Sequence, residues 1–252
     1  MPIIASLWWW ELRQRWLVVL GLIASTLIVI STASSTPVFT AAAAAVGIAF
    51  FPLRYQMRLV RWSVVGGLTL LHLIMKAPVW HLIARVSAVG GSTGYHRYLL
   101  IENFIHRFDE WWFMGVRSTA HWGWGQEDVT NHIILQGVTG GLVSLVLFVL
   151  LIAEAFKNAG ATWRAVRDAP REVWLAWGLG AVVFAHLMAF LGVSYFGQGN
   201  VILALHLALV GSLFQSKCKA PSFAASSPAS RSGMPHIRDV ERGIMEPYVS
   251  FT

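Results

Sequence analysis

Charged residues are scarce in this sequence. They make up 12% of its 252 residues, about half of the roughly 25% that soluble domains carry. Cysteine is scarcer still: Cys218 is the single one, which excludes an intrachain disulfide. The histidines lack the spacing of zinc sites such as His-Glu-x-x-His. We therefore expect no metal and no cofactor, and no soluble globular domain as the main body of the chain.

Hydrophobic residues instead account for 56% of the chain and gather in long runs. About 20 apolar residues span a bilayer as a helix, and in hydrocarbon the backbone groups must pair within such a helix. The sequence therefore predicts an all-α, polytopic transmembrane helix bundle with about six spans. We place the spans at residues 16–31, 37–53, 62–75, 132–153, 173–193 and 201–214.

Four segments follow from this pattern. Residues 1–75 hold an N-terminal interfacial segment and three spans, and residues 132–214 hold three more. Residues 76–131, between the two groups, form one long polar loop with an amphipathic helix. Residues 215–252 are rich in Ser, Pro and charge and have no periodic apolar face. We expect this tail to be disordered, because such a composition cannot bury a core.

Basic residues alternate between the loops. Lys and Arg cluster before the first span, after the second, between the fourth and fifth and after the last, whereas residues 32–36 and 194–200 have none. This positive-inside pattern predicts that both termini are cytoplasmic and that the long loop lies on the other side. The pattern also explains the net charge of +7. We therefore expect the lipid bilayer, and not a nucleic acid, as the partner of this charge.

The long loop contains one conflict between pattern and charge. From residue 95 to 110, apolar side chains share one face of a helix and polar side chains share the other. Arg97 falls within the apolar face, where an unpaired guanidinium is costly to bury. Either the helix begins after Arg97, or this residue points into a polar site with an anionic partner. Arg suits phosphate because its planar fork binds two oxygens.

Aromatic rings interleave with polar residues from 111 to 131. Trp111, Trp112, Trp122 and Trp124 stand close in sequence to Asn131 and to two carboxylates. Tryptophan faces beside amides and carboxylates are suited to glycan binding, because pyranose C–H faces stack on the rings. An aromatic belt at the membrane interface has a similar composition. The sequence leaves both interpretations open.

Together these features resemble the O-antigen ligase and polymerase superfamily of bacterial inner-membrane proteins. The resemblance covers about residues 75–152. It lies in Arg97 within the polar stretch 94–97, in the aromatic and glycine segment 111–115, and in the stretch 128–131. The next span then opens with the small residues of 136–142, which allow close packing. Family members generally have ten or more spans, so this chain resembles a shortened member or a C-terminal half.

The resemblance implies metal-independent transfer or polymerisation of an undecaprenyl-diphosphate-linked glycan at the periplasmic face. The partners would be a lipid-linked oligosaccharide and other membrane subunits of the polysaccharide pathway. Arg97 would bind the donor phosphate, with Arg85 or Arg117 assisting. A loop histidine would serve as general base, but the family places it just before an Asn, where this chain has Thr130. The candidate catalytic residues are therefore His121, Asp128 and His132.

Two other functions stay open. Six spans and the displaced histidine favour a non-catalytic membrane subunit that binds a glycan or a partner enzyme through its loop. His72, His186 and His206 lie inside predicted spans, where polar groups are rare and mark functional sites as a first hypothesis. They favour a small-molecule transporter, although neutral histidines bonded to a neighbouring helix also explain them.

Overall fold

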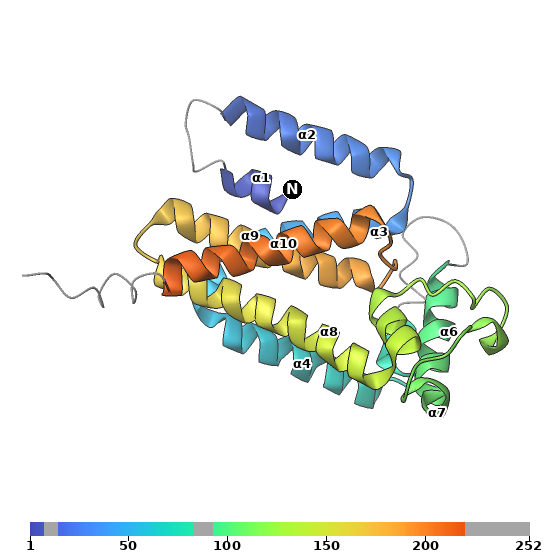
Figure 1. The fold of residues 1–252 in the computed structure, drawn as a ribbon. Helices are drawn as coiled ribbons and strands as arrows, with labels where there is room; N and C mark the ends of the chain where they lie inside the picture. Colours follow the sequence, from blue (N-terminus) through green and yellow to red (C-terminus); the bar gives the residue numbers. More distant parts are fainter. Residues whose placement is uncertain (8–14, 83–92, 220–252) are drawn as a thin grey trace, which may run out of the picture.

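The computed structural model describes residues 1–7, 15–82 and 93–219 (Figure 1). Within these residues the structure is helical and has no strand, so the predicted all-α class is confirmed. The longer helices are α2 (Arg15–Ser31), α3 (Ser35–Ala49), α4 (Met57–Ile74), α6 (Thr93–His106), α8 (His132–Ala165), α9 (Pro170–Phe190) and α10 (Gln198–Phe214). The short ones are α1 (Pro2–Ser6), η3 (Phe51–Gln56), η4 (Val79–His81), α7 (Phe108–Trp111), η5 (Ala120–Trp122) and the π-helical η6 (Gln215–Lys219).

Four stretches in the described residues are long and apolar enough to cross a membrane. They are Phe51–Ile74, His132–Ala165, Pro170–Phe190 and Gln198–Cys218. Each of the six predicted spans coincides with a helix, but α2 and α3, with 17 and 15 residues, are shorter apolar helices. Pro52 ends α3 early, because proline lacks the N–H that a continuing helix needs. By length and composition of its helices, the chain is a helical membrane protein.

Helix α9 is the centre of the bundle. It packs against α3, α8, α10 and α1, and the side chains it buries are mostly Ala, Val and Leu. Small residues let helices approach closely. A Cβ atom added to Gly47 of α3 would lie 3.0 Å from the Cβ of Ala181. The indole Nε1 of Trp177 donates a hydrogen bond to the Gly47 carbonyl at 2.8 Å, which fixes α9 against α3.

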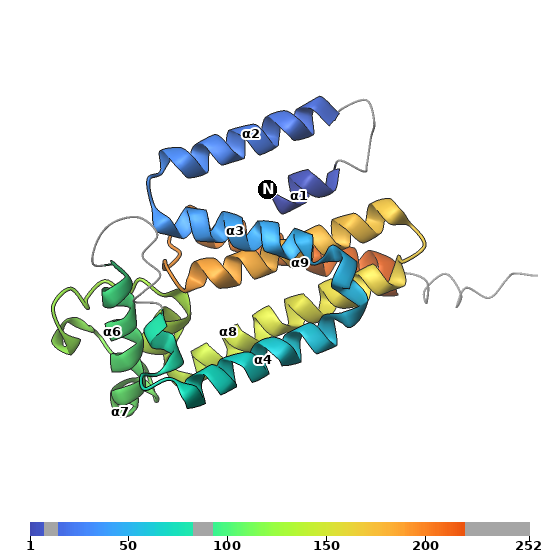
Figure 2. The ribbon, with the colours of Figure 1, turned by 180° about the vertical axis from the view of Figure 1, so that it is seen from behind.

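The long helices alternate in direction, so their links gather at two ends of the bundle (Figures 1 and 2). One end holds the link 32–34, the described polar segment 93–131 and the link 191–197. The opposite end holds η3 and the link 166–169. Arg54 lies in η3 and Arg167 in the link 166–169. The basic loops between helices therefore meet at the end of the bundle away from residues 93–131.

Residues 93–131, which we call the cap, pack on the first half of α8. Leu100, Trp111, Trp122 and Val129 of the cap form a buried cluster with residues of α8. The amphipathic helix predicted over 95–110 is present as α6 and α7, which are separated by a break at Arg107. The cap is thus a small folded unit with its own apolar core at one end of the bundle.

The backbone of the cap completes the hydrogen bonding of α8. Gly141 interrupts α8 with φ 70° and ψ −170°, a conformation that glycine adopts most readily. The carbonyl of Val138 and the N–H of Leu142, which would pair in a regular helix, are separated there. Val138 accepts from the N–H of Val116 at 2.7 Å, and Leu142 donates to the carbonyl of Trp112 at 2.8 Å.

Glycines make this contact between cap and helix possible. A Cβ atom on Gly115, which has φ 82°, would lie 2.4 Å from the Val138 carbonyl oxygen. A Cβ atom on Gly137 would lie 2.7 Å from the ring of Phe104. The close packing expected of the small residues at 136–142 is confirmed at Gly137 and Gly141.

Candidate functional site

The polar centre of the cap is the carboxylate of Glu110. Its oxygens accept hydrogen bonds from Nε2 of His121 at 2.7 Å, from Nε1 of Trp122 at 2.9 Å and from Nη1 of Arg107 at 2.8 Å. The hydrogen bonds from His121 and Trp122, followed by that from Arg107, lower the pKa of Glu110 to about 2. The carboxylate is therefore ionised at any physiological pH, and it holds the imidazole of His121 in one orientation.

Buried tryptophans position this group. Trp122 is buried, and the amide of Asn103 donates to its carbonyl at 3.2 Å. Trp111 stacks on Phe104 with ring centroids 4.0 Å apart and donates from its indole to the Phe104 carbonyl at 2.8 Å. The η5 turn (Ala120–Trp122) therefore sits rigidly on α6. The side chain of His121, 49% exposed, projects from this base into water.

A hydrogen-bond network around His96 supports the other side of the cap. Nε2 of Gln126 donates to Nδ1 of His96 at 3.1 Å, and Nε2 of His96 donates to the carbonyl of Asp128 at 3.3 Å. The hydroxyl of Thr119 donates to the carbonyl of Gln126. Gln126 is fully buried. This network fixes the backbone of the loop. The carboxylate of Asp128 is exposed, and it is not among the side chains that bond to Glu110.

His132 and Asn131 belong to the bundle rather than to the cap surface. Nδ1 of His132 accepts from the N–H of Tyr195 at 3.1 Å, and its buried ring lies 5.0 Å from the ring of Phe190 between centroids. Asn131 is the N-cap of α8, where its side-chain oxygen accepts from two backbone N–H groups. Both residues are buried, so neither presents a free polar group beside His121 in this structure.

The predicted phosphate-binding arginines are in three different situations. Arg97 lies inside α6, so the helix does not begin after it. It is half-buried, donates from Nη2 to the Thr36 hydroxyl at 3.0 Å, and has no carboxylate partner among the described residues. Burial lowers the pKa of its guanidinium, which stays protonated in proteins. Arg117 is exposed on the cap. Arg85 lies outside the described residues, as does the 220–252 part of the predicted tail.

The four tryptophans divide into two pairs. Trp111 and Trp122 are buried in the apolar core of the cap, where other side chains cover their faces. Trp112 is 47% exposed and Trp124 is 98% exposed. A ring that is exposed to this extent is available for stacking on a sugar. The candidate glycan-binding rings that the surface offers are therefore Trp112 and Trp124.

The Glu110–His121 pair is the feature that sequence analysis missed. Eleven residues separate the two side chains, and neither helical nor strand periodicity links them. The i,i+4 spacing pairs His106 with both Glu102 and Glu110, and in the structure His106 lies 3.5 Å from Glu102. The only signal in the sequence is the presence of both residues on one polar loop.

The arrangement can act as a base and does not resemble a metal site. The described residues hold no group of three or more His, Cys, Asp or Glu side chains able to bind a metal ion. In the neutral imidazole, the hydrogen bond from Nε2 to Glu110 leaves Nδ1 as the nitrogen able to accept a proton. No family model, curated protein or solved structure matches the chain significantly.

Proposed function

We propose that this protein transfers or polymerises a lipid-diphosphate-linked glycan at the water face of a bacterial inner membrane. The observation that carries the proposal is the Glu110–His121 pair, with its 2.7 Å hydrogen bond, on a rigid polar cap at one end of an apolar helix bundle. Such a placement gives a general base access both to water-soluble acceptors and to substrates anchored in the bilayer. The proposal also rests on the resemblance to the O-antigen ligase and polymerase superfamily.

The chemistry requires one proton acceptor. An acceptor hydroxyl attacks the anomeric carbon of the donor glycan, the bond from that carbon to the phosphate oxygen breaks, and the lipid diphosphate leaves. Nδ1 of His121 takes the hydroxyl proton. The ionised carboxylate of Glu110 orients the ring and stabilises the imidazolium that forms. Glu110 is thus a positioning residue, and His121 is the residue that contacts the acceptor.

Substrate contacts come from the exposed parts of the cap. Trp124 and Trp112 offer open ring faces for the sugars. Arg117 is exposed, and Arg97 is a half-buried cation whose hydrogen bond goes to a neutral hydroxyl. A diphosphate would provide the anionic partner that Arg97 lacks among the described residues. The carboxylate of Asp128, which is exposed, is the second candidate base.

The proposed orientation has the cap in the periplasm and both termini in the cytoplasm. Its support is that the basic loops between helices lie at the end of the bundle away from the cap, because basic loops are retained on the cytoplasmic side. In a Cys218→Ser background, Trp124→Cys places a thiol at a fully exposed cap position. We expect a membrane-impermeant thiol reagent to label it in intact spheroplasts. Labelling only after lysis would place the cap in the cytoplasm and contradict the proposal.

The catalytic test is glycan transfer by the purified full chain in proteoliposomes that contain a lipid-diphosphate-linked oligosaccharide. His121→Ala should abolish transfer. Glu110→Gln should lower the rate while leaving the KM for the donor unchanged, because it acts through His121. His106→Ala is the matched control, an exposed cap histidine that lies beside Glu102 instead, and it should retain the full rate. Equal rates for His121→Ala and the unmodified chain would refute the assignment.

A second candidate is a non-catalytic membrane subunit, and helix α4 favours it. None of its residues is buried, and the Cβ positions of Gly66 and Gly67 face open space. A spanning helix so exposed has room for a partner helix, since small residues permit close contact. Co-purification of the chain with a membrane glycosyltransferase, lost in Gly67→Leu, would support this function. Transfer by the isolated chain would exclude it.

A further inference from the structure

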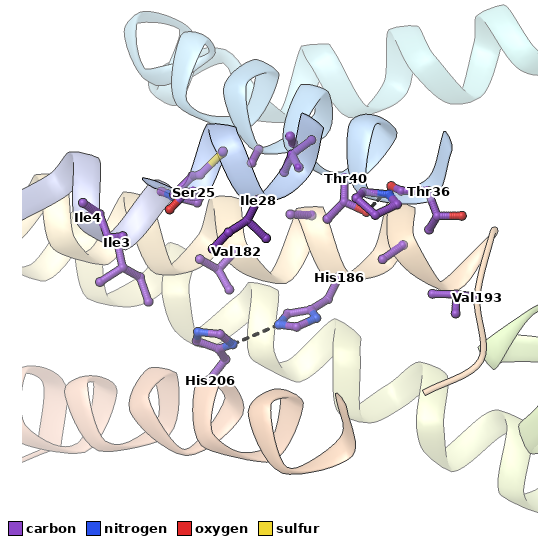
Figure 3. A pocket seen from close by; sticks show the side chains of 18 of the residues that line it. Ile3, Ile4, Ser25, Ile28, Thr36, Thr40, Val182, His186, Val193 and His206 are labelled. Atoms are coloured by element: carbon purple, nitrogen blue, oxygen red, sulfur yellow. Dashed lines mark hydrogen bonds between the residues drawn. The ribbon is translucent and has the colours of Figure 1, made fainter. Parts of the chain in front are cut away.

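A hydrogen-bonded chain of three side chains runs into the bundle between α9 and α10. His186 and His206 point toward each other from the two helices, and Nε2 of His186 lies 2.9 Å from Nδ1 of His206 (Figure 3). The other ring nitrogen of His186, Nδ1, lies 2.7 Å from the hydroxyl of Tyr195. His186 is buried, and His206 and Tyr195 are half-buried.

The geometry permits two proton arrangements of the same heavy atoms. In one, Tyr195 donates to His186, His186 donates from Nε2 to His206, and His206 carries its proton on Nε2. In the other, every hydrogen bond is reversed, and Tyr195 accepts from His186. A proton that enters at one end of the chain and one that leaves at the other convert the first arrangement into the second. No side chain has to move for this exchange.

The two ends of the chain lie at different depths. Tyr195 belongs to the link 191–197, at the same end of the bundle as the cap (Figures 1 and 2). His206 lies eight residues into α10, which at 1.5 Å per residue is about 12 Å along the helix. The chain therefore connects the cap end of the bundle with its interior.

His186, His206 and Tyr195 line a cavity of about 720 Å³. Helices α2, α3 and α9 supply most of its lining, which is largely apolar, with Ile28, Ala44 and Val182 among the residues. An ion inside such a cavity is costly unless a hydrogen-bonding partner shares its charge. A protonated histidine bonded to a second imidazole has such a partner, because the charge-assisted bond is stronger than a neutral one.

Other titratable groups near the chain come from the N-terminus, α8 and α6, whereas the described lining residues of α2 and α3 are not titratable. The amino group of Met1 is at the cavity, and His132 of α8 accepts from the backbone of Tyr195. Arg97 bonds to Thr36, which also lines the cavity. Among the described residues, the cavity lining has no Asp, Glu, Lys or Arg side chain. Of the lining residues that the structure describes, the histidine pair is therefore the side-chain group suited to accept a proton.

We propose that Tyr195, His186 and His206 form a proton half-channel, which carries protons from the cap end of the bundle to a binding site at the cavity. This inference is independent of glycan transfer, and neither His186 nor His206 belongs to the cap. The function assigned is reversible proton binding within the membrane interior. His72 does not share in it, because it lies on α4 and accepts from the N–H of Val79 instead.

A proton that moves into the low-dielectric interior displaces charge across the membrane, and this displacement is measurable. We would adsorb proteoliposomes of the full chain to a solid-supported membrane and apply a step of about one pH unit within the range where histidine titrates. The expected result is a transient current without a steady component. His206→Gln and Tyr195→Phe should lose the transient, while His72→Gln should keep it.

The design separates loss of the relay from loss of the fold. Tyr195→Phe retains the ring that packs on His132 and Phe190, so its melting temperature should stay near that of the unmodified chain. A transient that survives in both Tyr195→Phe and His206→Gln overturns the proposal. So does the absence of any transient in the unmodified protein, or an equal loss in His72→Gln. Glycan transfer by His206→Gln at the normal rate would leave the proposed cap function standing whatever the current shows.

Discussion

Replacement of Gly141 by Ala tests whether the backbone hydrogen bonds between the cap and α8 are needed for stability. Gly141 has φ 70° and ψ −170°, and a Cβ atom there would lie 2.5 Å from the carbonyl oxygen of Phe113. Because the clashing atom belongs to the backbone, rotation of a side chain cannot remove the clash. We expect Gly141→Ala both to strain the turn and to push the segment 112–116 away from α8.

The magnitude follows from these two effects. A non-glycine residue in such a backbone region costs about 1–3 kcal/mol. Displacement of the segment would also break the hydrogen bonds from Val116 to Val138 and from Leu142 to Trp112, each contributing about 0.5–1.5 kcal/mol. Together they give a loss of about 2–6 kcal/mol in the free energy of unfolding. For a chain of this size, the melting temperature should fall by roughly 5–20 °C.

The assay is thermal unfolding of the purified full chain in detergent, followed by circular dichroism and by tryptophan fluorescence. Gly67→Ala is the matched control, because its Cβ would meet nothing within 4 Å in the middle of α4. Alanine exceeds glycine in helix propensity by up to about 1 kcal/mol, so this control should be neutral or slightly stabilising. If Gly141→Ala melts within a degree of the unmodified chain, the break in α8 is not a structural requirement.

Three further predictions concern the cap. Asn131→Ala should destabilise the chain by about 1 kcal/mol through loss of the α8 N-cap, measured by urea unfolding, and Asn131→Asp should restore most of it. The pKa of Glu110 is lowered to about 2 from an ordinary 4.5, so its contacts stabilise the cap above pH 4.5. That stability should disappear as the pH falls from 4.5 to 2, and the pH dependence should vanish in Glu110→Gln. Trp111→Ala should cost about 3–5 kcal/mol, whereas Trp124→Ala should leave the melting temperature unchanged and weaken only glycan binding in a fluorescence titration. Comparable destabilisation by the two tryptophan replacements would contradict the division into buried and exposed rings.

The helices were predictable because they depend on local sequence. Apolar runs and the period of 3.6 residues located all six long bundle helices and the cap helix. The early end of α3 was less predictable, although Pro52 marks it. Four stretches are long enough to cross a membrane, whereas α2 and α3 are shorter. That α2 and α3 also span the membrane remains a prediction.

The site was less predictable because its contacts join residues that are distant in sequence. The bond between Arg97 and Thr36 connects α6 to α3, and no local pattern relates them. His186 and His206 were recognisable as polar residues inside spans, but their meeting depends on how α9 and α10 pack. The tryptophans showed the limit most clearly, since composition alone does not separate the buried Trp122 from the exposed Trp124.

The break in α8 at Gly141 has a consequence for the insertion of the protein into the membrane. Until residues 112–116 arrive, the carbonyl of Val138 and the N–H of Leu142 lack the partners they have in the finished protein, and hydrocarbon offers none. The first third of α8 is therefore expected to settle in the bilayer only after the preceding polar segment has been delivered to its side and has folded there. Insertion of the helix and folding of the cap would then be one cooperative event, with folding of the cap as its first step.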